Sequence, residues 1–386
     1  MILVSIIITI SYLFLIGCFV FGFDKIKLFE LEDMSSRTTF SVIIPFRNEA
    51  ENLPNLLKSI ESLEYPSHLF EIIFVDDTSD DDSVGLIMRF LTNVRNDIKV
   101  IKNKRISNSP KKDAITTAVK QSKNKWIITT DADCMLPKYW LNSFDAFIQK
   151  TNTKCIAAPI TYMNSSSFLD QFQLLDILSL QGATIGGFGI NKPFLCNGAN
   201  FGYEKSLFLE LNGFEGNTDI ASGDDIFLLE KVVETYPEKL HYLKCDKAIV
   251  KTKSQLSWKD LISQRIRWAA KTSAYNNWFG KFTGLIVLLM NALLISTLLL
   301  AILNVFNVFN VFNVFNVFNF KIWGYILILK FSIDFFLIYK SAYFFNQKAV
   351  LRRYIFGFIV YPFFSFYVAF ISLFKTYKWK GRSFKK

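Results

Sequence analysis

The stretch FVDDTSDDD, residues 74–82, joins the end of an apolar run to five aspartates and indicates the fold of the chain. Residues 71–75 are mostly apolar, and Asp76 and Asp77 follow them directly. Short apolar runs that end in acidic or turn-forming residues are typical of buried parallel strands. The stretches VIIPFRNEAEN (42–52) and TTDADC (129–134) repeat this arrangement, so three strand ends are expected to carry polar side chains.

Helical and strand patterns alternate around these stretches. Strands are expected at 40–45, 71–75 and 125–130, and helices at 49–63 and 113–121. The alternation predicts an α/β fold with a doubly wound, Rossmann-like mixed sheet. In such sheets the ligand crevice lies at the carboxyl ends of the strands, where the acidic residues are expected.

The acidic residues also indicate the chemistry. The chain has only two histidines and no Cys/His spacing typical of a metal site, so carboxylates are expected to carry out its ionic chemistry. Asp131 and Asp133 form an Asp-x-Asp at a strand end, which can direct two hard oxygen ligands toward Mg²⁺ or Mn²⁺ while phosphates supply others. The alternative for this motif by itself, a solvated acidic turn, stays open.

Apolar runs long enough to cross a bilayer flank the polar region. Residues 2–23 carry no charged side chain and predict a retained anchor, without the basic start and cleavage site of a signal peptide. Further spans are predicted at 282–303, 322–339 and 354–374. Asp334 lies inside one of them and is expected to face a partner helix or water. Five Asn-Val-Phe units at 304–318 are interpreted as a tolerated repeat without function.

Charge predicts the orientation only in part. The formal net charge is +11, and basic flanks against anionic headgroups explain it better than nucleic-acid binding, for which no basic stripe with aromatics is present. The Lys/Arg-rich segment after the first span places the polar region in the cytoplasm. Three later crossings would put the tail outside, whereas the basic tail at 375–386 favours the inside, so one run is re-entrant or interfacial under this reading.

Taken together, the ordered motifs resemble the family 2 inverting glycosyltransferases, which use nucleotide sugars and have the GT-A fold. The resemblance covers about residues 38–270. It rests on the segments VIIPFRNE, VDDTSDD, DAD, NGANFGYEKSLFLELNGF (197–214), SGDDIFL (222–228) and QRIRW (264–268). The last is similar to the QxxRW motif of the membrane-bound branch, and WKGR (379–382) is similar to an ending of lipid and carotenoid-type members.

The resemblance implies a donor site. Pro45, Arg47 and Glu49 would line the nucleoside, and Asp77 would accept the N–H of a uracil or guanine ring. Lys112 would lie near the diphosphate, although Lys111 stands where the family usually has glycine. Asp131 would contact ribose or metal, and Asp133 would be the stronger metal ligand. For Arg47 and Glu49 the alternatives are a surface salt bridge or a helix start.

The resemblance also implies the base and a helix at the acceptor. Asp225 aligns with the catalytic base and Asp224 with the neighbouring acid, and their roles can be exchanged. Both also fit the first turn of a helix. Gln264, Arg267 and Trp268 share one helix face and would contact diphosphate and acceptor, or rest on the membrane surface. Residues 168–180 and 184–194 are expected, from composition, to form a lipid-facing lip.

The sequence therefore predicts a membrane-bound glycosyltransferase of the cell (inner) membrane. Its segments would be an anchor at 1–23, a cytoplasmic GT-A domain at 38–275, a membrane region at 282–374 and a basic tail at 375–386. The donor would be a UDP-sugar rather than a GDP-sugar, the acceptor a membrane lipid, and the ion Mg²⁺ or Mn²⁺, with no nucleic-acid partner. The alternatives are a processive polysaccharide synthase and a non-catalytic membrane scaffold.

Overall fold

The computed structural model describes residues 2–94, 98–163, 166–271, 274–305, 320–374, 377–379 and 382–384. Apart from Asn304 and Val305, the repeat at 304–318 lies outside the described residues, as does half of the basic tail. The chain forms two compact units. The helical unit comprises residues 1–25, 164–192 and 255–377, and the sheet unit comprises 26–163, 193–254 and 378–386. Each unit is described by itself.

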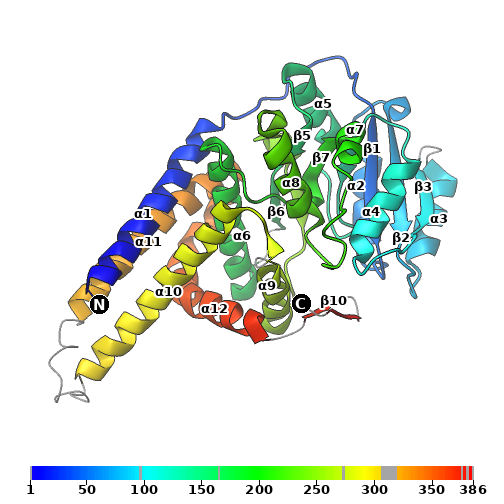
Figure 1. The fold of residues 1–386 in the computed structure, drawn as a ribbon. Coiled ribbons are helices and arrows are strands. Elements are labelled where there is room, and N and C mark those ends of the chain that lie inside the picture. The colour runs from blue at the N-terminus through cyan, green and yellow to red at the C-terminus, as the bar shows by residue number, and fades with distance from the viewer. Residues whose placement is uncertain are drawn as a thin grey trace. The chain divides into compact units, whose positions relative to one another are not determined.

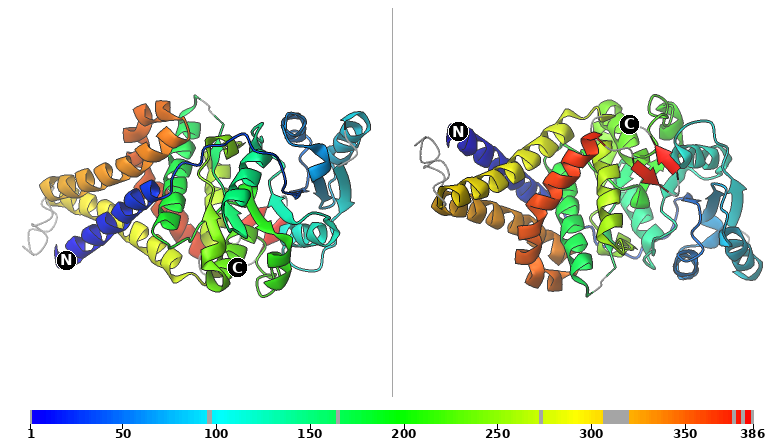
Figure 2. Two further views of the ribbon diagram at one scale, coloured as in Figure 1. Left: turned by 90° about the horizontal axis from the view of Figure 1, so that it is seen from above. Right: turned by 90° about the horizontal axis from the view of Figure 1, so that it is seen from below.

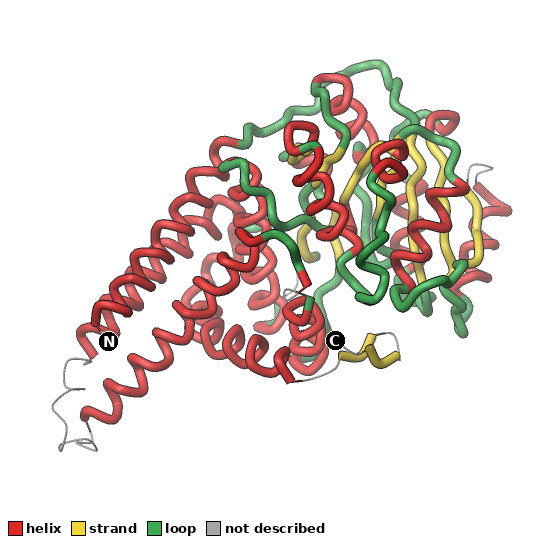
Figure 3. Tube along the Cα trace, in the orientation of Figure 1, coloured by secondary structure: helices red, strands yellow, loops and turns green. Residues whose placement is uncertain are grey.

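The sheet unit holds a mixed sheet with helices and loops around it, which Figure 3 distinguishes by colour. Its strands are β1 (Phe40–Phe46), β2 (Phe70–Asp76), β3 (Ile98–Lys102), β4 (Trp126–Thr129), β5 (Cys155–Ala157), β6 (Ile160–Tyr162), β7 (Phe201–Glu204), β8 (Leu240–Tyr242) and β9 (Val250–Thr252). Its α-helices are α2 (Leu53–Glu61), α3 (Ser83–Val94), α4 (Pro110–Gln121), α5 (Trp140–Lys150), α7 (Lys205–Glu210) and α8 (Asp224–Thr235). Its short 3-10 helices are η1 (Ser67–Leu69), η2 (Gly198–Asn200), η3 (Pro237–Lys239) and η4 (Asp246–Ala248).

The strand order of the main sheet creates a switch point beside β1. The order is β3-β2-β1-β4-β7-β5-β8, in which β3, β2, β1 and β4 are parallel and β7 is antiparallel to both of its neighbours (Figure 1). The chain runs outward from β1 to β3 and then crosses back to β4. Because such crossovers are right-handed, α2 and α3 belong to one face of the sheet and α4 to the other. The expected doubly wound mixed sheet is confirmed.

The sequence explains the central strands. Val42, Ile43, Ile44, Ile72 and Phe74 are all fully buried, as expected of strands covered on both faces. The first expected helix begins later than predicted, at α2, because the residues between β1 and α2 form turns. The backbone N–H groups of Asn52 and Leu53 both donate to the carbonyl oxygen of Glu49 in this turn.

The helical unit contains the apolar helices. They are α1 (Ile2–Lys25), α6 (Phe168–Gly189), α9 (Trp258–Ala270), α10 (Trp278–Val305), α11 (Phe320–Phe344), the 3-10 helix η7 (Lys348–Arg353) and α12 (Tyr354–Phe374). Among the described residues, four stretches are long and apolar enough to cross a membrane: Ile2–Lys25, Trp278–Leu303, Phe320–Phe344 and Lys348–Phe374. All four predicted apolar spans are therefore helices, and α1, α10 and α11 run beside one another in both views of Figure 2.

Glycines bring α6 against α1 in this unit. A Cβ atom on Gly189 would lie 1.8 Å from the carbonyl oxygen of Gly22, and one on Gly186 would lie 2.5 Å from that of Phe19. Small residues permit such close approach of two helices. Most apolar side chains of α6 are buried within the unit. The lipid-facing lip expected at 168–180 and 184–194 is therefore wrong for these side chains.

Asp334 faces partner helices, as expected. The hydroxyl of Tyr12 in α1 donates to Oδ1 of Asp334 over 2.5 Å, and the ammonium of Lys330, one turn away in α11, pairs with Oδ2. Lys330 is fully buried and lies over the rings of Tyr12 and Phe358. Since an ionised side chain is costly in an apolar bundle, these contacts fix the register of α1 and α11.

At the C-terminal end, β10 (Tyr377–Trp379) and β11 (Arg382–Phe384) form a separate two-stranded ribbon.

Candidate active site

Three neighbouring parallel strands place polar residues at the same edge of the main sheet. Arg47 follows β1, Asp77 follows β2 and Asp131 lies two residues beyond β4. The strands β2, β1 and β4 are adjacent and parallel, so their carboxyl ends meet at this edge. The switch point between β1 and β4 lies at the same place, which is where doubly wound sheets bind ligands.

The loops after β1 and β2 are joined to each other by hydrogen bonds. The guanidinium of Arg47 donates to the carbonyl oxygens of Asp77 and Thr78, at 2.8 and 2.6 Å, and pairs with the exposed carboxylate of Asp80 at 2.9 Å. Pro45 lies in β1 opposite Val75, directly before this region. Arg47 therefore shapes the loop that carries Asp77, a structural role that is compatible with a place beside a nucleoside.

Asp77 is held rigidly by basic and amide groups. Its carboxylate is buried and accepts two hydrogen bonds from the guanidinium of Arg105, at 2.6 and 2.5 Å. The side-chain amide of Asn103 donates both to Asp77 Oδ1, at 2.7 Å, and to the carbonyl oxygen of Pro110. A bidentate arginine fixes the plane of a carboxylate. The sequence reading missed Arg105, and its signal is a basic residue just after the third parallel strand.

The Asp131–Asp133 turn concentrates negative charge. Burial raises the pKa of Asp133 to about 6, and the carboxylates of Asp131 and Glu49 add to the effect. A raised pKa at a carboxyl indicates charge that its surroundings compensate incompletely. Glu49 is anchored by Asn52, whose side-chain amide donates to Glu49 Oε2 at 2.6 Å.

This donor set fits a divalent cation that also binds phosphates. Hard carboxylate oxygens at a strand end suit Mg²⁺ or Mn²⁺, which usually take one or two carboxylates from the protein and complete their shell with phosphates and water. Within the described part of the chain, no group of three or more acidic, histidine or cysteine side chains has the arrangement of a complete metal site. Asp131 and Asp133 would therefore hold the cation together with a ligand, not as a closed protein cage.

The two lysines that begin α4 point to different surroundings. The ammonium of Lys111 lies 2.7 Å from Asp131 Oδ1 and 3.2 Å from Asp224 Oδ2. The ammonium of Lys112 is buried, donates to the carbonyl oxygens of Asn217 and Ile220, and lies over the ring of Phe227. In this structure Lys112 thus holds the loop before α8 in place, whereas the ammonium of Lys111 lies beside Asp131 and Asp224.

Asp224 and Asp225 form the first turn of α8. Asp224 is buried, whereas Asp225 is half-buried and accepts hydrogen bonds from two backbone N–H groups, those of Gly198 at 3.0 Å and Ile226 at 2.8 Å. A helix N-terminus stabilises negative charge, which suits two carboxylates in this first turn. Through Lys111, Asp224 is connected to Asp131, which the sequence alone could not show.

Gly198 needs to be glycine where η2 meets α8. A Cβ atom there would lie 2.8 Å from Asp224 Oδ2 and 3.4 Å from the ammonium of Lys111. The carbonyl oxygen of Gly198 accepts from the hydroxyl of Thr129, the last residue of β4, at 2.8 Å. Asn200 supports the same segment, because its amide donates to Pro159 and Ala248 and it accepts from the indole of Trp140. The base candidate Asp225 is therefore connected to the sheet through η2, whose own hydrogen bonds hold it in place.

The predicted QRIRW residues lie in α9 of the helical unit. The buried arginine of this helix is Arg265, which the sequence reading did not single out. It donates to Asp176 of α6 at 2.7 Å, bonds to Gln264, and stacks 4.1 Å from the ring centre of Trp268. Arg267 and Trp268 are half-buried. Gln264 and Trp268 both contact Arg265 and thus contribute to the packing of α9. Their binding roles stay predictions.

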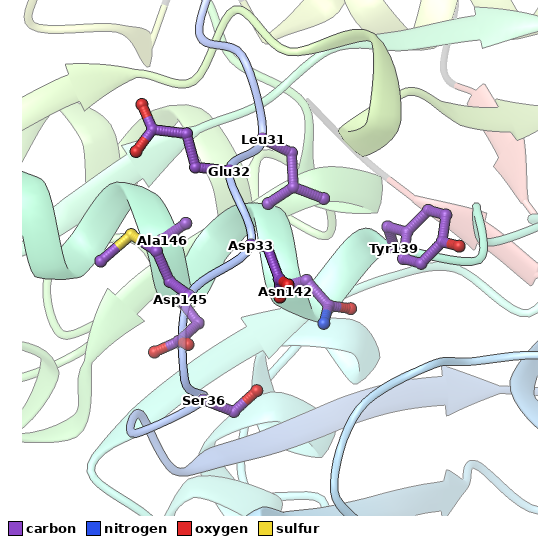
Figure 4. Close-up of a pocket in the computed structure, with 9 residues that line it drawn as sticks. Leu31, Glu32, Asp33, Ser36, Tyr139, Asn142, Asp145 and Ala146 are labelled. Carbon is purple, nitrogen blue, oxygen red and sulfur yellow. The ribbon is translucent and has the colours of Figure 1, made fainter.

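A shallow pocket elsewhere in the sheet unit is formed by the segment before β1. Figure 4 shows residues 31–36 running beside α5, which contributes Asn142, Asp145 and Ala146. The carboxylate of Asp145 accepts the backbone N–H of Thr38 at 2.9 Å and the side-chain amide of Gln149 at 3.0 Å. These bonds occupy Asp145 in holding the segment down, and none of the predicted site residues lines this pocket.

Comparison with known proteins finds similarity in part of the chain. Residues 41–211, less than half of the chain, match the family model described as Glycosyl transferase family 2. The match includes Asp77, Asp131 and Asp133 but ends before Asp224 and Asp225. The roles of the last two residues therefore rest on the geometry described above.

Two curated relatives illustrate the range of similar proteins. Poly-beta-1,6-N-acetyl-D-glucosamine synthase of Staphylococcus epidermidis is 27% identical over 243 residues, which cover 59% of this chain and 53% of the relative. Undecaprenyl-phosphate 4-deoxy-4-formamido-L-arabinose transferase of Pseudomonas syringae pv. syringae is 36% identical over 99 residues, which cover 25% of this chain and 28% of the relative. The chain thus matches about half or less of the length of these proteins.

A solved structure has the same fold. The mannosyltransferase PcManGT of Pyrobaculum calidifontis, solved in complex with GDP-Man and Mn²⁺, superposes with a TM-score of 0.55 at 15% identity. The superposition covers 89% of this chain and 97% of that one. The predicted GT-A architecture with flanking apolar helices is therefore confirmed.

Proposed function

We propose that this protein is a membrane-bound, metal-dependent inverting glycosyltransferase that moves a sugar from a nucleotide diphosphate sugar to a lipid acceptor. The observation that carries the proposal is the meeting of Asp131, Asp224 and Asp225 at one edge of the sheet. Lys111 bridges the first two, and Asp225 bonds to Gly198 beside them. This convergence unites the strand-end carboxylates with a carboxylate that can act as a base.

Asp225 is the proposed base. As the acceptor hydroxyl attacks the anomeric carbon, Asp225 takes its proton, the new C–O bond forms, and the bond to the diphosphate oxygen breaks. The attack on the face opposite the leaving group inverts the anomeric configuration. The N–H groups of Gly198 and Ile226 hold the carboxylate in place while leaving it half-exposed to an acceptor. We propose that Asp224 supports the base Asp225, because Asp224 is buried and its carboxylate pairs with Lys111.

The donor is proposed to lie across the loops after β1 and β2. Asp77, oriented by Arg105, would accept the ring N–H of the base, and Pro45, Arg47 and Glu49 would border the nucleoside. A UDP-sugar is proposed over a GDP-sugar. Lys112 contributes by holding residues 217–220 close to α4. The solved mannosyltransferase with this fold is a complex with GDP-Man and Mn²⁺, which supports a nucleotide-sugar donor.

Asp133 and Asp131 are the proposed ligands of Mg²⁺ or Mn²⁺. When bound, the cation would stabilise the charge that develops on the departing diphosphate. The pKa of Asp133 is raised first by burial and then by the carboxylates of Asp131 and Glu49, and a cation would offset that neighbouring negative charge. Arg267 of α9 is proposed as a further partner for the diphosphate, with Gln264 and Trp268 beside the acceptor.

A membrane lipid is the proposed acceptor. In the described part of the chain, four helical stretches are long and apolar enough to span a membrane, and one relative is named as an undecaprenyl-phosphate sugar transferase. We propose that the protein resides in the cell (inner) membrane with its sheet unit in the cytoplasm, because basic residues follow the first span. A donor made in the cytoplasm would then reach an acceptor headgroup in the adjacent leaflet.

The test uses the full chain in detergent with radiolabelled UDP- and GDP-sugars, Mn²⁺ and a polar lipid extract. We expect label to move into one organic-extractable lipid. Asp225→Asn should lower this rate at least a hundredfold, since general-base removal typically costs 10²–10⁴-fold. Asp246→Asn, at an exposed surface carboxylate, should retain activity. Full turnover in the Asp225 variant would refute the assignment of the base, and the absence of any donor turnover would favour a non-catalytic scaffold.

A polysaccharide synthase is the second candidate, because one relative is named as a synthase of a β-linked polymer. The two functions differ in product length. A synthase would yield polymer that remains in the aqueous phase or precipitates, whereas a lipid glycosyltransferase would yield a product with a fixed number of sugars. Mass spectrometry of the labelled product distinguishes them.

A further inference from the structure

Lys111 joins two carboxylates that come from distant parts of the sequence. Its ammonium lies 2.7 Å from Asp131 Oδ1 in the turn after β4 and 3.2 Å from Asp224 Oδ2 in the first turn of α8. The Lys111 side chain is 18% exposed and that of Asp224 is 8% exposed, so solvent screens this pair only weakly. The lysine thus occupies the face of Asp131 that is proposed to receive a cation.

The ammonium of Lys111 lies between two carboxylates of different exposure. Asp131 is the more exposed partner, at 37%, and Asp224 the more buried. The ammonium is carried on a flexible four-carbon stem, which allows it to leave one oxygen without moving the backbone of α4.

We propose that Lys111 is a counter-ion of Asp131 and Asp224 that competes with the divalent cation for Asp131. By this competition Lys111 keeps the affinity for the cation low until a donor diphosphate binds. This inference rests on the proposed function. A cation bound to Asp131 and the Lys111 ammonium would repel each other, because both are positive and both lie within a few ångströms of the same carboxylate. Cation binding therefore favours withdrawal of Lys111 from Asp131.

A phosphate group offers the displaced ammonium a new partner. Ammonium groups bind phosphate oxygens by short, charge-assisted hydrogen bonds. Lys111 can keep its contact with Asp224 while it exchanges Asp131 for a phosphate oxygen. As a consequence, cation and nucleoside diphosphate should bind together, each increasing the affinity for the other.

The experiment measures Mn²⁺ binding to the full chain in detergent by electron paramagnetic resonance of free Mn²⁺, with and without UDP. Lys111→Met removes the charge with little change in volume. We expect its dissociation constant for Mn²⁺ alone to fall about tenfold, equivalent to about 1.4 kcal/mol. The tightening of Mn²⁺ binding by UDP should be smaller in this variant than in the wild type. Lys111→Arg keeps the charge and should bind Mn²⁺ within about twofold of the wild type.

Two controls separate this inference from the proposed function. Asp133→Asn should weaken Mn²⁺ binding at least tenfold, and Lys111→Gln provides a second uncharged variant whose folding is checked by circular dichroism. If Asp133→Asn weakens binding but neither uncharged variant binds Mn²⁺ more tightly, the counter-ion role of Lys111 is overturned and the metal site stands. If Asp133→Asn binds Mn²⁺ like the wild type, the metal site of the proposed function is overturned, and the role of Lys111 with it.

Discussion

The backbone N–H of Gly198 donates to Oδ2 of Asp225 over 3.0 Å, and this bond joins the segment after α6 to the first turn of α8. A Cβ atom on residue 198 would lie 2.8 Å from Asp224 Oδ2, so a side chain there would displace the Asp224 carboxylate. The proposed base is therefore held by a backbone group of a segment whose close approach to α8 favours glycine.

Substituting Gly198 tests this arrangement. In Gly198→Ala the new methyl group would lie 2.8 Å from Asp224 Oδ2, so Asp224 or η2 must shift. We expect sugar transfer to fall at least tenfold while the melting temperature changes by only a few degrees. Gly284→Ala in α10, where no atom lies within 4 Å of the added Cβ, is the matched control and should keep normal activity. Equal rates for the two variants would contradict a positioning role for Gly198.

Asp77 can be tested through donor affinity. Asp77→Asn leaves the residue size unchanged but replaces one acceptor oxygen with an amide, so the ring N–H of the nucleoside loses its partner and Arg105 loses half of its bidentate bond. We expect the KM for the donor to rise about tenfold or more, with a smaller change in kcat. Asp82→Asn removes an exposed ion pair to Arg89 in the same loop region and should alter neither constant more than twofold. A loss confined to kcat would exclude a nucleoside-binding role for Asp77.

The raised pKa of Asp133 predicts pH-dependent metal binding. Its carboxyl binds a proton below about pH 6, so protons compete with Mn²⁺, and the affinity should fall up to tenfold for each pH unit below that value. In the metal-free protein, the stability of the fold should depend on pH in the opposite sense to the Mn²⁺ affinity. The folded pKa exceeds the ordinary value of 3.8, so the fold loses stability as the pH rises through about 6.

Titration of Mn²⁺ binding between pH 5 and 8 checks the first expectation, and thermal unfolding of the metal-free chain over the same range checks the second. Asp133→Asn should remove the step near pH 6 from both curves. A step that persists in this variant belongs to another group.

We expect substitutions of the two arginines of α9 to affect different properties, stability for Arg265 and sugar transfer for Arg267. Arg265 forms a buried ion pair with Asp176, in which the side chains are 7% and 5% exposed. Removing one partner leaves an uncompensated buried charge, so Arg265→Ala should destabilise the helical unit by about 3 kcal/mol or more. Arg267 is only half-buried, so Arg267→Ala should lower the stability less than Arg265→Ala does, and it should lower sugar transfer. Thermal melts and transfer assays of both variants in the same detergent test this contrast, and an equal loss of stability would show that both arginines serve packing.

Much of the fold was predictable from the sequence because its signals are local. The apolar runs of β1 and β2 ended at the polar residues that the sequence indicated, and the four apolar stretches of spanning length that were predicted are helical in the described residues. Strand burial and helix length depend on neighbouring residues, so they can be read from a short window. The ordered acidic motifs also indicated the glycosyltransferase family 2 domain that the comparison supports.

Other features depend on contacts between distant segments. Which lysine of the pair 111–112 reaches Asp131 is decided by the rotation of α4 once the helix starts at Pro110, and that rotation is fixed by packing against the sheet. The choice of Arg265 over Arg267 as the buried arginine of α9 similarly depends on Asp176 in α6. Composition indicated a lipid-facing lip at 168–180 and 184–194, but most of this stretch forms helix α6, whose Gly186 and Gly189 allow close contact with Phe19 and Gly22 of α1.

The sequence by itself indicated the first strands of the α/β pattern, the apolar helices and the acidic motifs, because each follows from residue type and local spacing. Only the tertiary structure decided that Asp131 and Asp224 share one ammonium and that Gly198 holds Asp225. The physical reason is that charge pairing and close backbone approach act over a few ångströms in space, between residues that lie tens of positions apart in the chain.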